Sequence, residues 1–311
     1  MKKFIIKIIL ILLPAVIFGI TLELLARDIP TSYSAKDHNL SKKKEKIEVL
    51  VLGSSHANFG INPEYFGREA FNISNTSQGL YQDYKVLLKY LPQCKKLKMV
   101  IVPISYFTLQ SELAMSPEAW RCSYYSVYMG VQANPSSTKF DLKNYSALFL
   151  WDGPLGVIKG IRKTNKLDIN EYGYQSPPKS KTIVEELIND KTGKERVGFH
   201  DKIMKKEIIE SNVSVLNEIA KDLSMRNIKM VIVTPPVYKT YYENILQENY
   251  DLMTSTIDVI AEKHQIKIFN YFKDKRFEMN DFMDNDHLNE DGARKFSYIL
   301  KNEVVDNFLL K

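Results

Sequence analysis

Short apolar runs alternate with amphipathic stretches along most of the chain. Five runs share aliphatic and β-branched side chains and are four to eight residues long: residues 47–52, 70–73, 97–104, 228–234 and 266–269. Such runs are typical of strands buried in a parallel sheet. Between them, residues 80–91 and about 201–225 carry apolar side chains at spacings of three and four, which predicts helices that connect the strands.

Strands that alternate with helices predict an α/β fold with three layers, α/β/α, around a mostly parallel five-stranded sheet. Ligands of such sheets bind beyond the carboxyl ends of the strands. Residues 110–200 interrupt the rhythm with Trp120, Trp151, several tyrosines and Pro177-Pro178. We interpret this stretch as an insertion or a cap over the cleft.

The N-terminus contains the longest apolar stretch. Residues 4–22 carry one charge, Lys7, and are about as long as a helix must be to cross a bilayer of about 30 Å. Lys2, Lys3 and Lys7 precede or begin the stretch, so the positive-inside rule places the rest of the chain outside the cytoplasm. The alternative is a cleaved signal peptide, for which Leu24-Leu25-Ala26 would be a poor cleavage site.

These patterns divide the chain into three parts. Residues 1–27 are expected to be a single-pass membrane anchor, and residues 28–46, with a run of lysines at 42–46, a solvated stalk or linker. Residues 47–311 form the α/β domain with its insertion at about 110–200. The expected location is extracytoplasmic, in the periplasm or on the outer face of the inner membrane.

Composition excludes several classes of protein. With 44% hydrophobic residues in 311, the chain can bury a substantial core and is not disordered. A net charge of +6 without a basic stripe does not favour a nucleic-acid partner. The two cysteines, Cys94 and Cys122, are assigned no function, and no Cys/His cluster with metal-ligand spacing is present. No cofactor or metal is expected.

Two short motifs carry the candidate chemistry. Gly53-Ser54-Ser55-His56 follows the first predicted strand, and Asp284-Asn285-Asp286-His287-Leu288-Asn289 lies near the C-terminus. A serine hydroxyl becomes a nucleophile when an imidazole accepts its proton and a carboxylate orients that imidazole. Ser55, His287 and Asp284 fit these three catalytic roles.

The two motifs together resemble those of the SGNH/GDSL hydrolase superfamily. Its first motif places the nucleophilic serine after the first strand, where Ser55 stands, and its last motif, Asp-x-x-His, matches Asp284 and His287. The resemblance covers roughly residues 47–307 and implies an SGNH/flavodoxin-like fold. Ser54 stands where the superfamily has an aspartate, and we expect it to shape the turn.

Other residues compete for these roles. His56 is a rival base, but adjacent side chains usually point apart, so we expect it to line the pocket or to face solvent. Asp281 and Asp286 are rivals for the carboxylate. A different interpretation is that the Asp/Asn-rich loop only caps a helix that begins near Asn289.

The resemblance also implies an oxyanion hole. We expect the backbone N–H of Ser55 and that of Ser77 or Gly79 to donate to the oxyanion; Ser77 stands where the superfamily has a glycine. The superfamily's third donor is an asparagine, but the chain has Ser105 there, so Ser105, Asn75 or another group substitutes, or turnover is slow. Tyr106 and Tyr238 are further candidates for the pocket, although dense aromatics are more often packed in cores.

The resemblance extends to membrane-anchored relatives that act in alginate O-acetylation and to the D-alanyl-lipoteichoic-acid protein. It implies a serine esterase or O-acyltransferase that acts on acyl esters, acetyl above all, of a cell-envelope glycan. The alternative is a glycan-binding or assembly module with a decayed site, which the missing asparagine motivates. A third interpretation is a partner subunit of a multi-pass membrane acyltransferase.

Overall fold

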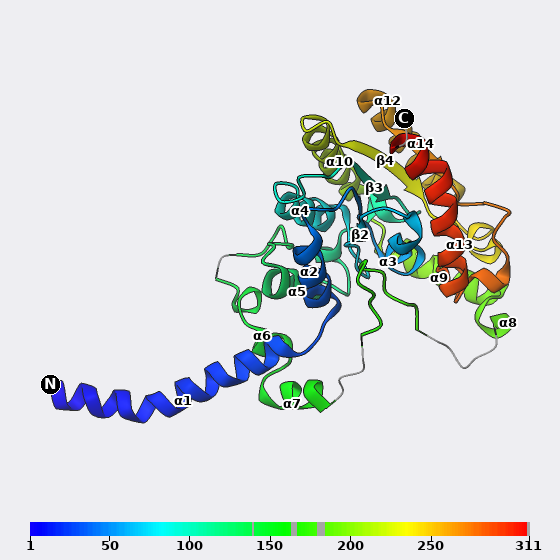
Figure 1. Cartoon of the computed structure of the whole chain (residues 1–311). Helices are drawn as coiled ribbons and strands as arrows, with labels where there is room; N and C mark the ends of the chain where they lie inside the picture. Colours follow the sequence, from blue (N-terminus) through cyan, green and yellow to red (C-terminus); the bar gives the residue numbers. More distant parts are fainter. Residues whose placement is uncertain (139, 163–166, 179–183, 310–311) are drawn as a thin grey trace.

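The chain folds around one sheet in which all strand pairs are parallel. The structure, a computed structural model, describes residues 1–138, 140–162, 167–178 and 184–309. The five strands have the order β2-β1-β3-β4-β5 (Figure 1). They are β1 Val49–Val51, β2 Ala70–Asn72, β3 Met99–Pro103, β4 Lys229–Thr234 and β5 Lys267–Asn270. The predicted parallel α/β sheet is confirmed, and each predicted apolar run overlaps one strand, with β5 ending one residue beyond its run.

Helices cover both faces of the sheet. Four pack on one face: α2 Ser32–Lys43, α4 Leu80–Tyr90, α10 Ile209–Ser224 and α12 Gln247–His264. The other face is covered mainly by α3 Ser55–Gly60 and α13 Glu290–Leu300. The three predicted layers are therefore present.

Side-chain alternation along the strands explains the two layers of core. Leu50 of β1 and Val100 of β3 belong to the cluster that contains Leu87 of α4. Their neighbours Val49 and Ile101 belong to the cluster that faces α13. Successive side chains of a strand point to opposite faces, so an uninterrupted apolar run contributes side chains to the core on both faces of the sheet.

Most of the remaining helices lie between β3 and β4 in the sequence. They are α5 Arg121–Met129, α6 Ala147–Leu150, α7 Pro154–Arg162, α8 Val184–Leu187, α9 Asp190–Ile203, α11 Lys239–Tyr242 and α14 Asp306–Leu309. α5 is part of the main core, because Cys122 and Tyr125 are buried with the strand residues. α9 lies beside α11 at the rim of the sheet.

The expectation of a solvated stalk at residues 28–46 is wrong for most of that segment. Residues 32–43 form α2, and Tyr33, Lys36 and Leu40 are buried on one side of it. Thr31 caps the helix by accepting a hydrogen bond from the N–H of Ser34 at 3.0 Å. The spacing of the three buried residues is helical, so the segment packs on α5 instead of standing in solvent.

The single long helix expected at about 201–225 is also divided. α9 ends at Ile203 and α10 begins at Ile209. Between them, the N–H of Lys205 donates to the carbonyl of Gln110 at 2.7 Å. Met204 and Lys205 adopt extended backbone conformations there, so a tertiary contact overrides the helical pattern.

The N-terminal helix α1, Lys2–Asp28, has the length and composition of a membrane span. Its most apolar window has a mean hydropathy of 2.7, and its side chains are almost entirely exposed. Pro14 lies inside the helix, as membrane helices tolerate. Figure 1 shows α1 projecting away from the sheet and its covering helices.

Candidate functional site

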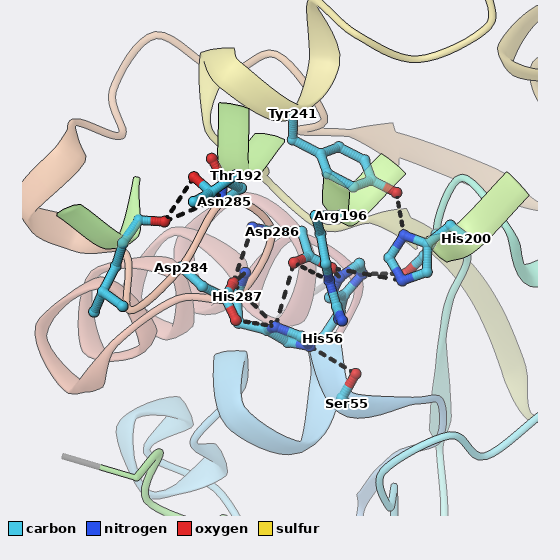
Figure 2. A network of polar contacts seen from close by, with 12 residues as sticks. Ser55, His56, Thr192, Arg196, His200, Tyr241, Asp284, Asn285, Asp286 and His287 are labelled. Atoms are coloured by element: carbon cyan, nitrogen blue, oxygen red, sulfur yellow. Dashed lines mark hydrogen bonds and ion pairs between the residues drawn. The ribbon is translucent and has the colours of Figure 1, made fainter. Parts of the chain in front are cut away.

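The side chains of Ser55, His287 and Asp284 meet at the carboxyl end of the sheet (Figure 2). The Ser55 Oγ lies 2.8 Å from the Nε2 of His287. The Nδ1 of His287 lies 2.9 Å from one carboxylate oxygen of Asp284 and 3.1 Å from the other. The hydroxyl, imidazole and carboxylate thus form one continuous path for a proton.

The turn after β1 delivers Ser55 to this point. Gly53 has a φ of +111°, and a Cβ there would come within 3.2 Å of the Pro103 ring, so both the conformation and the space favour glycine. The N–H of Gly53 donates to the Asp83 carboxylate at 2.7 Å. Burial raises the pKa of Asp83 to about 7, despite hydrogen bonds from Gln78 and Gly53. Ser55 is then the first residue of α3.

The loop before α13 holds the other two residues. Asp284 accepts hydrogen bonds from the backbone N–H groups of Asp286 and His287, at 3.0 and 2.7 Å. Asn289 caps α13 by accepting from the N–H of Gly292 at 3.0 Å. The loop therefore does both things that the sequence left open: Asn289 caps the helix, and Asp284 pairs with the histidine.

Two carboxylates act on His287. Burial lowers the pKa of His287, but the nearby charges of Asp286 and Asp284 outweigh burial and leave it above its ordinary value. The carboxylate of Asp286 lies 3.5 Å from His287 Nδ1, farther than that of Asp284. Asp284 is therefore the direct partner, and Asp286 adds charge from the side.

Asp286 is the centre of a second, buried network. It is 1% exposed and accepts hydrogen bonds from Arg196 Nε at 2.7 Å and His56 Nε2 at 2.9 Å. His200 Nε2 lies 3.8 Å from the same carboxylate, and its Nδ1 is 2.6 Å from the Tyr241 hydroxyl. Burial raises the pKa of Asp286, but the nearby His287, Arg196 and His56 outweigh burial and hold it well below its usual range. Asp286 thus stays ionised.

His56 belongs to this network, so the expectation that it lines the pocket or faces solvent is wrong. Burial lowers its pKa more than Asp286 raises it, which favours a neutral ring. Nε2 then donates to Asp286, and Nδ1 accepts from the Ser105 hydroxyl at 2.5 Å. Ser105 is 3% exposed and outside the cavity lining, so this second Ser–His–Asp series has no access to a substrate.

A cavity of about 280 Å³ opens beside the first series. Ser55 and His287 line it, together with residues of the loop after β2, the segment after β3, and α9. Three of the lining residues are charged: Glu112, Glu118 and Arg196. No motif in the sequence marks these three residues. The cavity wall therefore carries two carboxylates and one guanidinium close to Ser55 and His287.

Two backbone N–H groups are available for an oxyanion. Ser55 is at the N-terminus of α3, and its N–H has no partner among the described residues. The N–H of Ser77 is likewise unpaired within the described chain, and Ser77 lines the cavity. Ser77 has a φ of +60°, the conformation that glycine favours, at the position where the superfamily has glycine. Its hydroxyl donates to Glu118.

Gly79 does not fit the oxyanion role expected of it. Its N–H donates to the Gln82 side chain at 3.0 Å, because Gly79 is the N-cap of α4. Nor does Ser105 replace the asparagine of the superfamily, since its hydroxyl is bound to His56. The N–H groups of Ser55 and Ser77, which have no partner among the described residues, remain as the candidate donors.

The other pocket candidates lie behind the cavity wall. Asn75 is buried at 1% exposure and does not line the cavity. The Tyr106 hydroxyl is 2.9 Å from Asp201 and also accepts from the N–H of Leu246, so it joins elements inside the fold. Tyr238 packs against Phe282. These residues are excluded from the pocket because packing and hydrogen bonds hold them elsewhere.

The buried network contains potential metal ligands, but its charges disfavour a cation. Donor atoms of His56, Asp286 and His287 lie within 4.8 Å of one another. The guanidinium of Arg196 already pairs with Asp286 and would repel a metal ion there. His287 also faces Ser55 and Asp284 with its two ring nitrogens. The residues fit a proton path better than a metal.

Fold and site together define an α/β protein that presents a Ser–His–Asp series beside a cavity at the carboxyl ends of parallel strands. Residues 140–302 match the family described as "Protein of unknown function (DUF1574)". The chain belongs to this family. The matched residues include His287 and Asp284, but they begin after Ser55.

Solved structures include a similar chain. The comparison found a GDSL-like lipase from Bacteroides thetaiotaomicron VPI-5482, with 9% sequence identity and a TM-score of 0.41. The similarity covers 89% of this chain and all of the lipase. A comparison with curated proteins found no significant match.

Proposed function

We propose that the protein is a serine enzyme that cleaves or transfers acyl esters. The observation that carries the proposal is the 2.8 Å contact of Ser55 Oγ with His287 Nε2, at the wall of a cavity. His287 accepts the hydroxyl proton as Ser55 attacks the acyl carbon, and Asp284 stabilises the imidazolium that results. The N–H groups of Ser55 and Ser77 donate to the oxyanion.

Collapse of the tetrahedral intermediate completes the first half. The ester C–O bond breaks, the leaving alcohol takes the proton from His287, and Ser55 keeps the acyl group. In the second half, His287 accepts a proton from water or from a sugar hydroxyl as that oxygen attacks the acyl-enzyme. The bond between the acyl carbon and Ser55 Oγ then breaks, and His287 returns the proton to Ser55. Water gives hydrolysis, and a sugar gives O-acyl transfer.

The proposed substrate is an acetyl or similar ester of a cell-envelope glycan. The resemblance to membrane-anchored envelope enzymes supports this class. A cavity of about 280 Å³ suits a short acyl group with part of a sugar ring. The helix α1 supports a tethered enzyme, and Lys2, Lys3 and Lys7 favour an outward-facing domain. A multi-pass acyltransferase is the proposed source of acyl groups if the reaction is transfer.

An activated acetyl ester tests the reaction. The full chain in detergent should release the alcohol with a burst of one equivalent, and Ser55→Ala should abolish the burst. Ser54→Ala is the matched control, because the Ser54 side chain makes no cap hydrogen bond although it is adjacent. If the reaction is transfer, a glycan acceptor should raise the rate of alcohol release and should itself become acetylated. Unchanged turnover in Ser55→Ala contradicts the proposal.

A second candidate function, a glycan-binding module without turnover, is motivated by one observation. The serine at the position of the superfamily's asparagine, Ser105, is bound to His56 and gives the cavity no third oxyanion donor. Such a module would show no burst but would bind envelope glycan, with loss of binding on changes to the cavity wall.

A further inference from the structure

Exposed apolar side chains gather where α1 meets the rest of the protein. They come from the segment before α6, from α6 and from α7. We call this set the α6–α7 surface: Phe140 at 91% exposure, Leu142 at 62%, Phe149 at 51%, Leu155 at 73% and Ile158 at 43%. Figure 1 shows α6 and α7 beside the C-terminal end of α1, apart from the sheet. An apolar surface of this kind marks a contact that the isolated chain does not make.

The helix α7 has one face toward the protein and one away from it. Val157 and Gly160 are buried, and a Cβ on Gly160 would come within 2.8 Å of Ile29, just beyond α1. On the opposite face, Leu155 and Ile158 are exposed together with Lys159 and Arg162. Apolar and basic side chains on one exposed face are typical of a helix that lies in a membrane interface.

The junction with α1 is fixed by hydrogen bonds. Glu23 of α1 accepts from the N–H groups of Ala147 and Leu148 at 2.9 and 3.0 Å, and so caps α6. Arg27 donates to the carbonyls of Val127 and Tyr145 at 3.2 and 2.7 Å. These bonds prevent α1 from turning freely, so α6 and α7 keep a set place relative to the membrane span.

Aromatic side chains also stabilise the junction between α1 and the rest of the protein. The Trp151 indole donates to the Tyr128 hydroxyl at 3.0 Å, and that hydroxyl donates to the carbonyl of Ala26 at 3.1 Å. Trp and Tyr are enriched where helices leave a bilayer, because their rings are apolar and their polar atoms reach water. The junction therefore lies at the depth of the lipid headgroups if α1 crosses the bilayer.

We propose that the α6–α7 surface rests on the outer leaflet, with its apolar residues among the upper acyl chains and Lys159 and Arg162 at anionic headgroups. The bilayer is the occupant that the structure favours, because the surface continues the apolar surface of α1 and adds positive charge. The surface thereby fixes the orientation of the catalytic cavity above the lipid. The inference rests on α1 spanning the membrane, and not on the enzymatic activity.

Nitroxide labels on the full chain in vesicles of zwitterionic and anionic lipid test the proposal. Cysteines replace Leu142, Leu155, Ile11 of α1 and Val259 of α12, one at a time; native Cys94 and Cys122 are buried. Power-saturation spectroscopy then compares collisions with oxygen, which concentrates in lipid, and with a water-soluble nickel complex. Ile11→Cys controls for the anchor. Val259→Cys, at 66% exposure for the native valine, is the matched apolar control far from α1.

The expected result is a higher oxygen-to-nickel ratio at positions 142 and 155 than at 259, by several-fold, with the highest ratio at 11. Ratios at 142 and 155 equal to that at 259 would overturn the proposal. Protection from both reagents would overturn it as well, because it would indicate contact with protein, here a second copy. A label at 11 that collides with nickel would refute the anchor and the proposal with it. Thermal unfolding of each labelled variant confirms the fold.

Discussion

Replacement of Asp284 by asparagine should be more damaging than its replacement by alanine. Asp284 Oδ1 accepts the N–H groups of Asp286 and His287 at 3.0 and 2.7 Å, so an asparagine oxygen keeps that position. The asparagine NH₂ group then faces His287 Nδ1, 2.9 Å away in the native structure, and donates to it. The proton of the neutral ring moves to Nε2, which points at Ser55 and no longer accepts.

The magnitude follows from this tautomer. A base in the wrong tautomer lowers the rate by about 10⁴-fold, or about 5.5 kcal/mol of barrier. In Asp284→Ala no donor faces Nδ1, and the Asp286 carboxylate, 3.5 Å from Nδ1, remains to accept its proton. Acylation by Asp284→Ala should therefore be faster than acylation by Asp284→Asn by roughly tenfold or more, which corresponds to a barrier lower by about 1.4 kcal/mol.

Acylation rates measure the effect without product release. Release of the alcohol from an aryl acetate in a single turnover, followed by stopped flow with enzyme in excess, gives the rate constant of the first half-reaction for wild type and both variants. Asp284→Asn within tenfold of wild type would refute the role of Asp284. A larger loss in Asp284→Ala than in Asp284→Asn would refute the tautomer argument and leave no part for Asp286 as a substitute partner.

Three further changes test separate parts of the account. Asp286→Asn removes a charge that raises the pKa of His287, so the acid limb of the kcat/KM profile should move to lower pH; an unmoved limb would exclude this influence. Ser77→Gly keeps the N–H and the left-handed conformation, so acylation should stay within about threefold, whereas a loss of about 10²-fold would assign the donor to the hydroxyl. Leu40→Ala should lower the unfolding free energy by about 2–5 kcal/mol in a denaturant titration, because Leu40 is buried. A change below about 0.5 kcal/mol would indicate that α2 does not pack on the domain and is a solvated stalk.

The strands could be predicted because their signal is local. Each one is a short apolar run such as residues 47–52, and the turn at Gly53 follows from a glycine that ends it. The helix α2 was missed because the lysine run at 42–46 dominated its composition. The buried positions Tyr33 and Leu40, seven residues apart, carry the helical signal that identifies its packed face.

The proximity of Ser55, His287 and Asp284 could be predicted because two motifs each have a recognisable form. The network around Asp286 could not, because Arg196 and His200 come from α9, about 90 residues earlier in the chain. Nothing in the local pattern of residues 190–203 distinguishes a helix over the site from one elsewhere on the surface. His56 was misplaced because its burial depends on the same distant partners.

A covalent probe tests the central claim most directly. The full chain is treated with a fluorophosphonate, and intact mass and peptide mapping locate the adduct. We predict one adduct, on Ser55, in wild type and in Ser54→Ala, and none in Ser55→Ala. Absence of an adduct on a folded wild-type chain, or an undiminished adduct in Ser55→Ala, would contradict the assignment of Ser55 as the nucleophile.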